Sequence, residues 1–387
     1  MNTHRSLALL ALGAAAMLAT ADHAVRTRTA LERLESRGFP RVFMPWNGIA
    51  PPPGDALEAA ARHDLLWHNI HWFGLEPKGG GLIEWTGFTE ASIEAARAKV
   101  DRLRTLNPDM IVMVEMRYRD APDWALPEDH AIWLRDDEGE RVMSWPEGGY
   151  LKLDTDSPDL RAMVARQSAY FMSLGIFDGL FFDWWYDAEP DRLRLMEAVR
   201  AKVPDETVIV VNANDNTIPN TAHLVNGSFM ECWASPDWGT WGKIEETLVW
   251  LESNTRQPRV NALSTWWATG RDEFDRVRAT TALALTRSDG FALFTDPNDL
   301  PTPDHLHDWY AFWDTDLGRP EGPGREHEDG TVRRAFQRGT VVYNRPGQDE
   351  VVVRFETPRT SVRTGRTART HALPSPEGDI YLPTEPR

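Results

Sequence analysis

The sequence predicts an α/β protein in which a (β/α)8 TIM barrel, residues 40–318, is followed by a small C-terminal antiparallel β domain, residues 319–387. Eight short apolar runs alternate with stretches of helical period, and eight strand–helix units in about 270 residues match the size of such a barrel. An open doubly wound sheet is the alternative, but no glycine-rich phosphate loop follows an early strand. After the Pro/Gly stretch GRPEGPG, short alternating strands with turns indicate the second domain.

Each predicted barrel strand is a short run of mainly apolar residues, many of them β-branched or aromatic. The runs are RVFMPWN (41–47), LLWHNIHWF (65–73), MIVMVEM (110–116), IFDGLFFD (176–183), TVIVVNAN (207–214), VNGSFMECW (225–233), RVNALSTWW (259–267) and GFALFTD (290–296).

Helix signals separate these strands. Thr89 can cap a helix that extends to residue 106, and residues 191–203 repeat apolar side chains at helical spacing. Ser157-Pro158-Asp159 supplies an N-cap, a proline at the first helical position and an acid in the first turn, while Gly175 is a candidate C-cap. A last helix is expected around residues 303–317.

The connection after the third strand is unusually long. Residues 117–156 lack a sustained period, and loops of that length in compact domains are usually lids or binding loops. This segment should lie on the face where the strands' carboxyl ends open.

The N-terminal residues 1–21 have a short basic region, an apolar stretch and a small-residue cleavage site, which predict a secretory signal peptide. A membrane anchor is the alternative, but the apolar stretch is shorter than the roughly 20 residues that a spanning helix needs. The protein is therefore expected to be secreted or periplasmic, without membrane attachment after cleavage. The single cysteine, Cys232, excludes an intrachain disulfide and is expected to be packed.

The charge balance favours some partners over others. The chain has 59 acidic and 42 basic residues, a net charge of −17, which repels polyanions. Nucleic acid and anionic membrane surfaces are therefore not expected partners, and a neutral substrate fits better. The oligomeric state is left open.

Two acids stand at the carboxyl ends of predicted strands. Asp183 ends the fourth run on the same face as Phe181, and Glu231 stands near the end of the sixth on the same face as Phe229. A carboxylate that ends a buried run is costly unless it is paired or used. Carboxylates on strands two apart can face each other across the barrel mouth, as glycoside hydrolysis requires. A helix N-cap or a structural ion pair is the alternative role for Asp183.

The aromatic residues near Glu231 suggest which of the two acids is the general acid. Trp233, Trp238 and Trp241 follow Glu231, and aromatic crowding would raise the pKa of its carboxyl group and favour the general-acid role. Asp183 is then expected to act as nucleophile or base.

Polar residues at other strand ends are expected to bind the substrate. Glu115 and Arg117 share the inward face of the third strand, where they could hold sugar hydroxyls or simply pair with each other. Asn212 and Asn214 share a face at the fifth strand end, where their amides could recognise hydroxyls or cap the loop.

Tryptophan is unusually abundant, with 17 in the chain. Flat rings stack on the apolar faces of sugars, although most of these side chains should be in the core. His71 on the second run and Asp296 at the end of the eighth are further candidates. With these two, the further residues expected to bind the substrate are Trp46, His71, Trp72, Trp185, Trp233, Trp266 and Asp296.

The stretches GLFFDWW, NGSFMECW, LALTRSDGFALF and RRAFQRGTVVYNRP resemble a broad group of bacterial TIM-barrel glycosyl hydrolases, over roughly residues 40–360. The chain is similar to the endo-α-1,4-polygalactosaminidase family and, more distantly, to the α-galactosidase clan. The resemblance implies Asp183 as nucleophile, Glu231 as acid/base and a small C-terminal β domain. The α-galactosidase clan has Asp at the position of Glu231, and the sugar-binding residues of the polygalactosaminidases have no one-to-one match, so no substrate is implied.

The sequence thus predicts a secreted glycoside hydrolase for a neutral or amino-sugar polysaccharide or oligosaccharide, without metal or cofactor. A carbohydrate-binding barrel without activity is the first alternative, because it would need the tryptophans but not the acid pair. A metal-dependent hydrolase or deacetylase is less favoured, since His68 and His71 would face opposite sides of a strand.

Overall fold

The computed structural model describes residues 28–52, 54–79, 83–297 and 304–384. The predicted signal peptide, residues 1–21, lies outside the described residues. Within the described ranges, no helix is long and apolar enough to cross a membrane.

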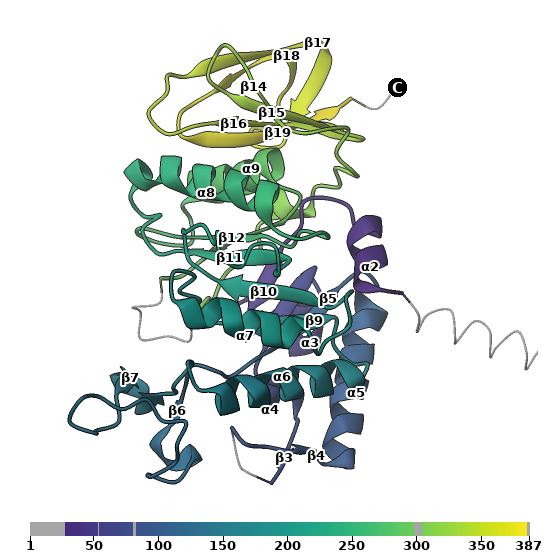
Figure 1. Ribbon diagram of the computed structural model, residues 1–387. Coiled ribbons are helices and arrows are strands. Elements are labelled where there is room, and N and C mark those ends of the chain that lie inside the picture. The colour runs from purple at the N-terminus through teal and green to yellow at the C-terminus, as the bar shows by residue number, and fades with distance from the viewer. Residues whose placement is uncertain (1–27, 53, 80–82, 298–303, 385–387) are drawn as a thin grey trace, which may run out of the picture.

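Eight parallel strands form the predicted TIM barrel (Figure 1). In sheet order they are β1 (Phe43–Pro45), β2 (Leu65–His68), β5 (Ile111–Glu115), β9 (Gly179–Phe182), β10 (Val208–Asn212), β11 (Gly227–Cys232), β12 (Ala262–Trp266) and β13 (Phe291–Thr295). A parallel bridge between Val42 and Ala292 closes the ring, and the Ala292 N–H donates to the Arg41 carbonyl at 2.9 Å. Each strand lies within one of the eight predicted runs.

The two faces of the strands bury separate cores, as a barrel requires. Inside the barrel, Trp67 stacks on Phe181 with ring centroids 4.4 Å apart, and Phe229 lies 5.1 Å from Trp67. The alternate residues, such as Leu180 and Phe182, pack outward against the helices. The inward position of Phe181 and Phe229 sends Asp183 and Glu231, two residues further along, toward the barrel mouth.

The surrounding helices are α2 (Ala30–Ser36), α3 (Ala56–Ala60), α4 (Ile70–Phe73), α5 (Glu90–Leu106), α6 (Pro158–Ser173), α7 (Pro190–Arg200), α8 (Trp241–Asn254) and α9 (Phe274–Arg287). The predicted caps are confirmed: the side chains of Thr89 and Ser157 accept backbone N–H groups, and Gly175 has φ of 63°.

Two predicted features of the barrel are wrong in detail. The described residues hold no α-helix between β10 and β11, so the strand–helix alternation is incomplete. The described part of the expected last helix, 304–317, contains only a 3-10 turn, Ala311–Asp314. The backbone there bonds elsewhere: the Ala50 N–H donates to the His307 carbonyl at 2.9 Å, and Tyr310 and Trp313 are buried against the barrel.

The long segment after β5 folds into a small three-stranded sheet, which we call the lid subdomain (residues 117–156). Its strands, in sheet order, are β6 (Asp120–Pro122), β8 (Tyr150–Lys152) and β7 (Met143–Trp145). Figure 1 shows it projecting from the side of the barrel, away from the C-terminal domain. A shorter insertion forms the hairpin of β3 (Pro77–Lys78) and β4 (Gly87–Phe88).

The C-terminal domain is a six-stranded antiparallel sheet. Its strands are β14 (Arg325–Glu326), β15 (Val332–Phe336), β16 (Gly339–Asn344), β17 (Val351–Ser361), β18 (Thr367–Leu373) and β19 (Glu377–Pro383). Figure 1 shows it above α8 and α9. A salt bridge of 2.7 Å joins Arg278 of α9 to Glu377 of β19, so this domain supports the barrel wall.

The close approach of neighbouring strands predicts a sharp effect at Gly227. A Cβ atom there would lie 2.0 Å from the Val260 carbonyl oxygen, so Gly227→Ala must displace backbone. We expect a loss of about 2 kcal/mol or more in the free energy of unfolding. Gly242→Ala in α8, where a Cβ would meet nothing within 4 Å, is the matched control and should stabilise the protein by up to about 1 kcal/mol. Thermal unfolding followed by circular dichroism measures both, and equal midpoints would contradict the packing argument.

Candidate active site

The side-chain amide of Asn212 connects the two predicted acids. Its Nδ2 donates to Asp183 Oδ1 and to Glu231 Oε2, both at 2.9 Å. Asp183 follows β9, Asn212 ends β10 and Glu231 lies in β11, so three neighbouring strands deliver the three side chains. Two oxygens bonded to one nitrogen can be no further apart than twice that distance, and the carboxylates are therefore close neighbours.

The backbone fixes the orientation of this amide. Asn212 Oδ1 accepts the Asn214 N–H at 3.1 Å, which leaves both N–H groups of Nδ2 for the carboxylates. Asn214 achieves this with φ of 53°, a left-handed conformation that is unfavourable for a residue other than glycine. Trp46, Trp184 and His305 also have positive φ, so strained residues gather around the barrel mouth.

A third carboxylate, that of Glu115, completes the cluster. The Trp46 Nε1–H donates to Glu115 Oε2 at 2.8 Å, and Arg117 lies 3.7 Å from Oε1. The indole of Trp46 stands edge-on to Trp67 and Phe181, on top of the inner core. Trp46 therefore forms part of the floor of the site, and the predicted inward direction of Glu115 is confirmed.

Burial and like charge act together on Asp183. Desolvation, followed by the negative charges of Glu115 and Glu231, raises the pKa of its carboxyl group to about 7. Arg119 and the hydrogen bond from Asn212 oppose this shift without cancelling it. Asp183 therefore exchanges its proton near neutral pH, as acid–base chemistry requires.

Glu231 has different neighbours from those expected. Trp241 lies in the outer core, donates to the Ser235 carbonyl at 2.9 Å and packs on Trp238 with ring centroids 4.5 Å apart. The expected crowding by these two rings is therefore wrong, because the chain enters α8 at this point. His305 instead places its Nε2 3.3 Å from Glu231 Oε1.

The sequence did not predict a place in the site for His305, or for Tyr118 and Arg119, which follow β5. The His305 ring is fully buried and stacks on Trp46 with centroids 5.4 Å apart. Tyr118 donates its hydroxyl to the carbonyls of Asp183, at 2.7 Å, and Trp184, at 3.1 Å. Arg119 lies 3.7 Å from the centre of the Trp184 ring. The sequence RYRD (117–120), which is rich in charged and aromatic residues and follows β5, could have pointed to Tyr118 and Arg119.

Three predicted substrate contacts lie in positions other than those expected. Trp185 is 2% exposed and donates to Thr221 Oγ1 at 3.1 Å, so it belongs to the core. The left-handed turn at Trp184 reverses the expected alternation, and Trp184, 39% exposed, takes its place at the mouth. Trp72 packs between His68 and Lys99 in the short helix α4. His71 also lies in α4 rather than on a strand, yet it lines the pocket described below.

The remaining candidates are spread around the mouth. Trp233 is 60% exposed two residues after Glu231, and Trp266, at the end of β12, is half-buried. Asp296 is buried just after β13, and its N–H donates to the Leu306 carbonyl at 3.1 Å.

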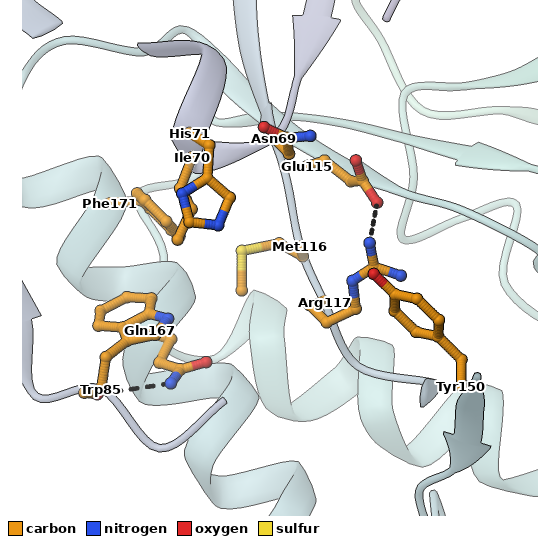
Figure 2. Close-up of a pocket in the computed structure, with 10 residues that line it drawn as sticks. All are labelled: Asn69, Ile70, His71, Trp85, Glu115, Met116, Arg117, Tyr150, Gln167 and Phe171. Atoms are coloured by element: carbon orange, nitrogen blue, oxygen red, sulfur yellow. Dashed lines mark hydrogen bonds and ion pairs between the residues drawn. The ribbon is translucent and has the colours of Figure 1, made fainter. Parts of the chain in front are cut away.

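A pocket opens beside the three carboxylates and shares Glu115 with them (Figure 2). It is lined by both apolar and polar side chains, and the guanidinium of Arg117 lies between Glu115 and the ring of Tyr150. Asp183 and Glu231 are not among the lining residues, so the pocket adjoins the pair rather than containing it. It is lined by Asn69, Ile70, His71, Trp85, Glu115, Met116, Arg117, Tyr150, Gln167 and Phe171.

Across the described ranges, no three His, Cys, Asp or Glu side chains are arranged so that they could bind a metal ion. The ring of His68 stacks on Trp72, with centroids 5.1 Å apart, while His71 faces the pocket.

No family model and no curated protein matches the sequence. Among solved structures, the chain is similar to a maltogenic α-amylase from Thermotoga neapolitana, with a TM-score of 0.57, 11% identity and coverage of 89% of this chain and 99% of that one. It is also similar to a cyclic α-maltosyl-(1→6)-maltose hydrolase from Arthrobacter globiformis (0.55, 14%, 89% and 99%). A third is a β-L-arabinopyranosidase from Geobacillus stearothermophilus (0.52, 10%, 92% and 99%). At these identities the similarity establishes the TIM-barrel fold with its C-terminal β domain.

The raised pKa of Asp183 predicts a pH-dependent cost to stability. In the unfolded chain this carboxyl loses its proton near 3.8, whereas in the folded protein it does so at about 7. The folded state therefore binds more protons between these values, and stability falls as pH rises through this window. Asp183→Asn should remove the loss, raising the free energy of unfolding at pH 8 by about 2–4 kcal/mol and at pH 4 by much less.

Thermal unfolding of both proteins at the two pH values tests this prediction. The control is Asp137→Asn, because Asp137 is exposed in the lid subdomain. This substitution should leave the difference in unfolding temperature between pH 4 and pH 8 unchanged. Equal effects of Asp183→Asn at pH 4 and pH 8 would contradict the electrostatic account.

Proposed function

We propose that the protein is a secreted glycoside hydrolase that uses Asp183 and Glu231 as its pair of carboxylates. The observation that carries the proposal is the shared amide of Asn212, which holds both acids at the barrel mouth. Catalytic groups of TIM-barrel enzymes come from the carboxyl ends of different strands, which is where these residues lie. The solved structures with the same fold described above include glycoside hydrolases.

The proposed mechanism gives each acid one role. Asp183 attacks the anomeric carbon as nucleophile, while Glu231 protonates the leaving oxygen and later activates a water molecule. A carboxylate that is buried beside other negative charges is destabilised as an anion and gains most from a neighbouring oxocarbenium-like centre. The shared nitrogen keeps the two bonded oxygens within twice 2.9 Å of each other, which is compatible with this double displacement.

The proposed substrate is a neutral or amino-sugar polysaccharide or oligosaccharide. Glu115, Asp183 and Glu231 crowd one side of the mouth, and such a site repels uronic acids and sulfated sugars. The rings of Trp46, Trp233 and Trp266 supply surfaces on which sugar rings can stack.

Removal of either carboxylate should abolish hydrolysis. Asp183→Asn and Glu231→Gln are expected to lower reducing-sugar release by at least about 1,000-fold on a panel of α- and β-linked polysaccharides, with the fold retained by circular dichroism. Azide should give a glycosyl azide of inverted configuration with Asp183→Gly, where it replaces the missing nucleophile, and one of retained configuration with Glu231→Gly, where it attacks the glycosyl-enzyme intermediate. Binding of the panel without turnover by the unaltered protein would favour a carbohydrate-binding barrel instead.

The pH profile separates the two roles. If Asp183 is the nucleophile it must be ionised, so kcat/KM should rise with pH through about 7, the pKa of its carboxyl group in the free protein. An activity that falls through pH 7 would instead make Asp183 the acid and reverse the assignment. The anomer first released, observed by proton NMR, should have the configuration of the substrate.

A further inference from the structure

Three large aromatic side chains, one in the lid subdomain and two in the segment that follows Asp183, are exposed. Trp145 is 47% exposed, Trp184 39% and Tyr186 50%. Trp145 belongs to β7 of the lid subdomain, whereas Trp184 and Tyr186 follow Asp183 directly. Single exposed aromatics are common on protein surfaces, but connected sets beside a pocket mark binding surfaces.

The lid end of this set is a continuous series of contacts. The rings of Trp145 and Tyr150 lie 5.4 Å apart, and the Arg117 guanidinium lies 5.3 Å from the centre of Tyr150. Arg117 is bound in turn by Asp120 at 2.9 Å. Figure 2 shows Arg117 against Tyr150, at the edge of the pocket.

The same buried carboxylate continues the series toward Asp183. Asp120, only 1% exposed, also binds Arg119 at 2.9 Å. Arg119 covers one face of Trp184 at 3.7 Å, and Trp184 contacts Tyr186 with ring centroids 6.5 Å apart. Contacts among aromatic rings, two guanidinium groups and the Asp120 carboxylate thus connect the lid subdomain to the residue after Asp183. We call Trp145, Tyr150, Trp184 and Tyr186 the aromatic wall.

We propose that the aromatic wall binds several consecutive sugar units of a polysaccharide, so that the protein cleaves within a polymer chain. This inference rests on the proposed glycosidase function. Sugar rings stack on flat aromatic faces, and Trp184 is still 39% exposed with the Arg119 guanidinium against its ring. Because the rings are already held by these contacts, little side-chain freedom is lost when a chain binds.

The position of the pair within the exposed rings favours internal cleavage. The wall ends at Trp184 and Tyr186, next to Asp183, and Trp233 is exposed on the other side, next to Glu231. Asn212, which lies on the strand between β9 and β11, holds the two acids between these surfaces. A polymer that lies along both would place an internal bond at the carboxylates.

Binding by an inactive protein tests the wall without relying on turnover. In the Asp183→Asn background, we expect native gels that contain soluble starch, galactomannan or chitosan to retard the protein in at least one case. Adding Trp145→Ala or Trp184→Ala should raise the dissociation constant for that polymer by about fivefold or more. Phe274→Ala, which removes a 54% exposed ring at the start of α9, is the control and should leave retardation unchanged.

Retardation by none of the three polymers, or retardation that survives both tryptophan substitutions, would overturn the proposal. A further readout is viscosity: cleavage within chains should lower it steeply for each reducing end released, and slow loss of viscosity would indicate attack from chain ends. Inactivity of the unaltered protein, with wall-dependent binding preserved, would refute the glycosidase function but not the binding surface.

Discussion

The hydrogen bonds from one neutral amide to two carboxylates are the constraint on which the site depends. Asn212 donates one N–H to Asp183 and one to Glu231, so it holds the acids together without neutralising either of them. A lysine or arginine in this place would keep both acids ionised. The amide compensates each negative charge only in part, and the pair can still carry a proton near neutral pH. The left-handed backbone of Asn214 is what keeps this amide from turning.

This arrangement is unfavourable in itself, and the rest of the barrel stabilises it. Buried carboxylates and left-handed residues other than glycine each cost free energy. The compensation lies directly beneath, where Trp67, Phe181 and Phe229 fill the barrel and Trp46 lies on them with its N–H toward Glu115. A packed aromatic core cannot easily deform, so it holds the strand ends, and the acids on them, in fixed positions.

Sequence reasoning succeeded where local pattern decides the structure. Strands of a parallel barrel are buried on both faces, so they appear as apolar runs, and alternation by two correctly directed Glu115, Asp183 and Glu231 inward. The alternation did not predict side-chain positions correctly beyond the ends of the strands. The turn at Trp184 exchanged the places of Trp184 and Trp185, and a helix begins at Ile70, just before His71. His305 could not be predicted, because its position follows from long-range contacts of a segment that lacks the expected helix.

In the proposed mechanism, the chemistry and the recognition of the polymer fall to different parts of the chain. The strands supply the carboxylates, while the lid subdomain supplies Arg117, Arg119 and two rings of the aromatic wall. The two parts are joined through one buried side chain, Asp120, which binds both arginines and also accepts a hydrogen bond from Ser144 at 2.9 Å. Since Arg119 both contacts Trp184 and opposes the rise in the pKa of Asp183, the proposed sugar-binding surface and the proposed nucleophile share one cation. A ligand that stacks on Trp184 and excludes water from Arg119 would strengthen that attraction and favour the ionised form of Asp183. Binding along the wall would then help to prepare the nucleophile as well as place the bond.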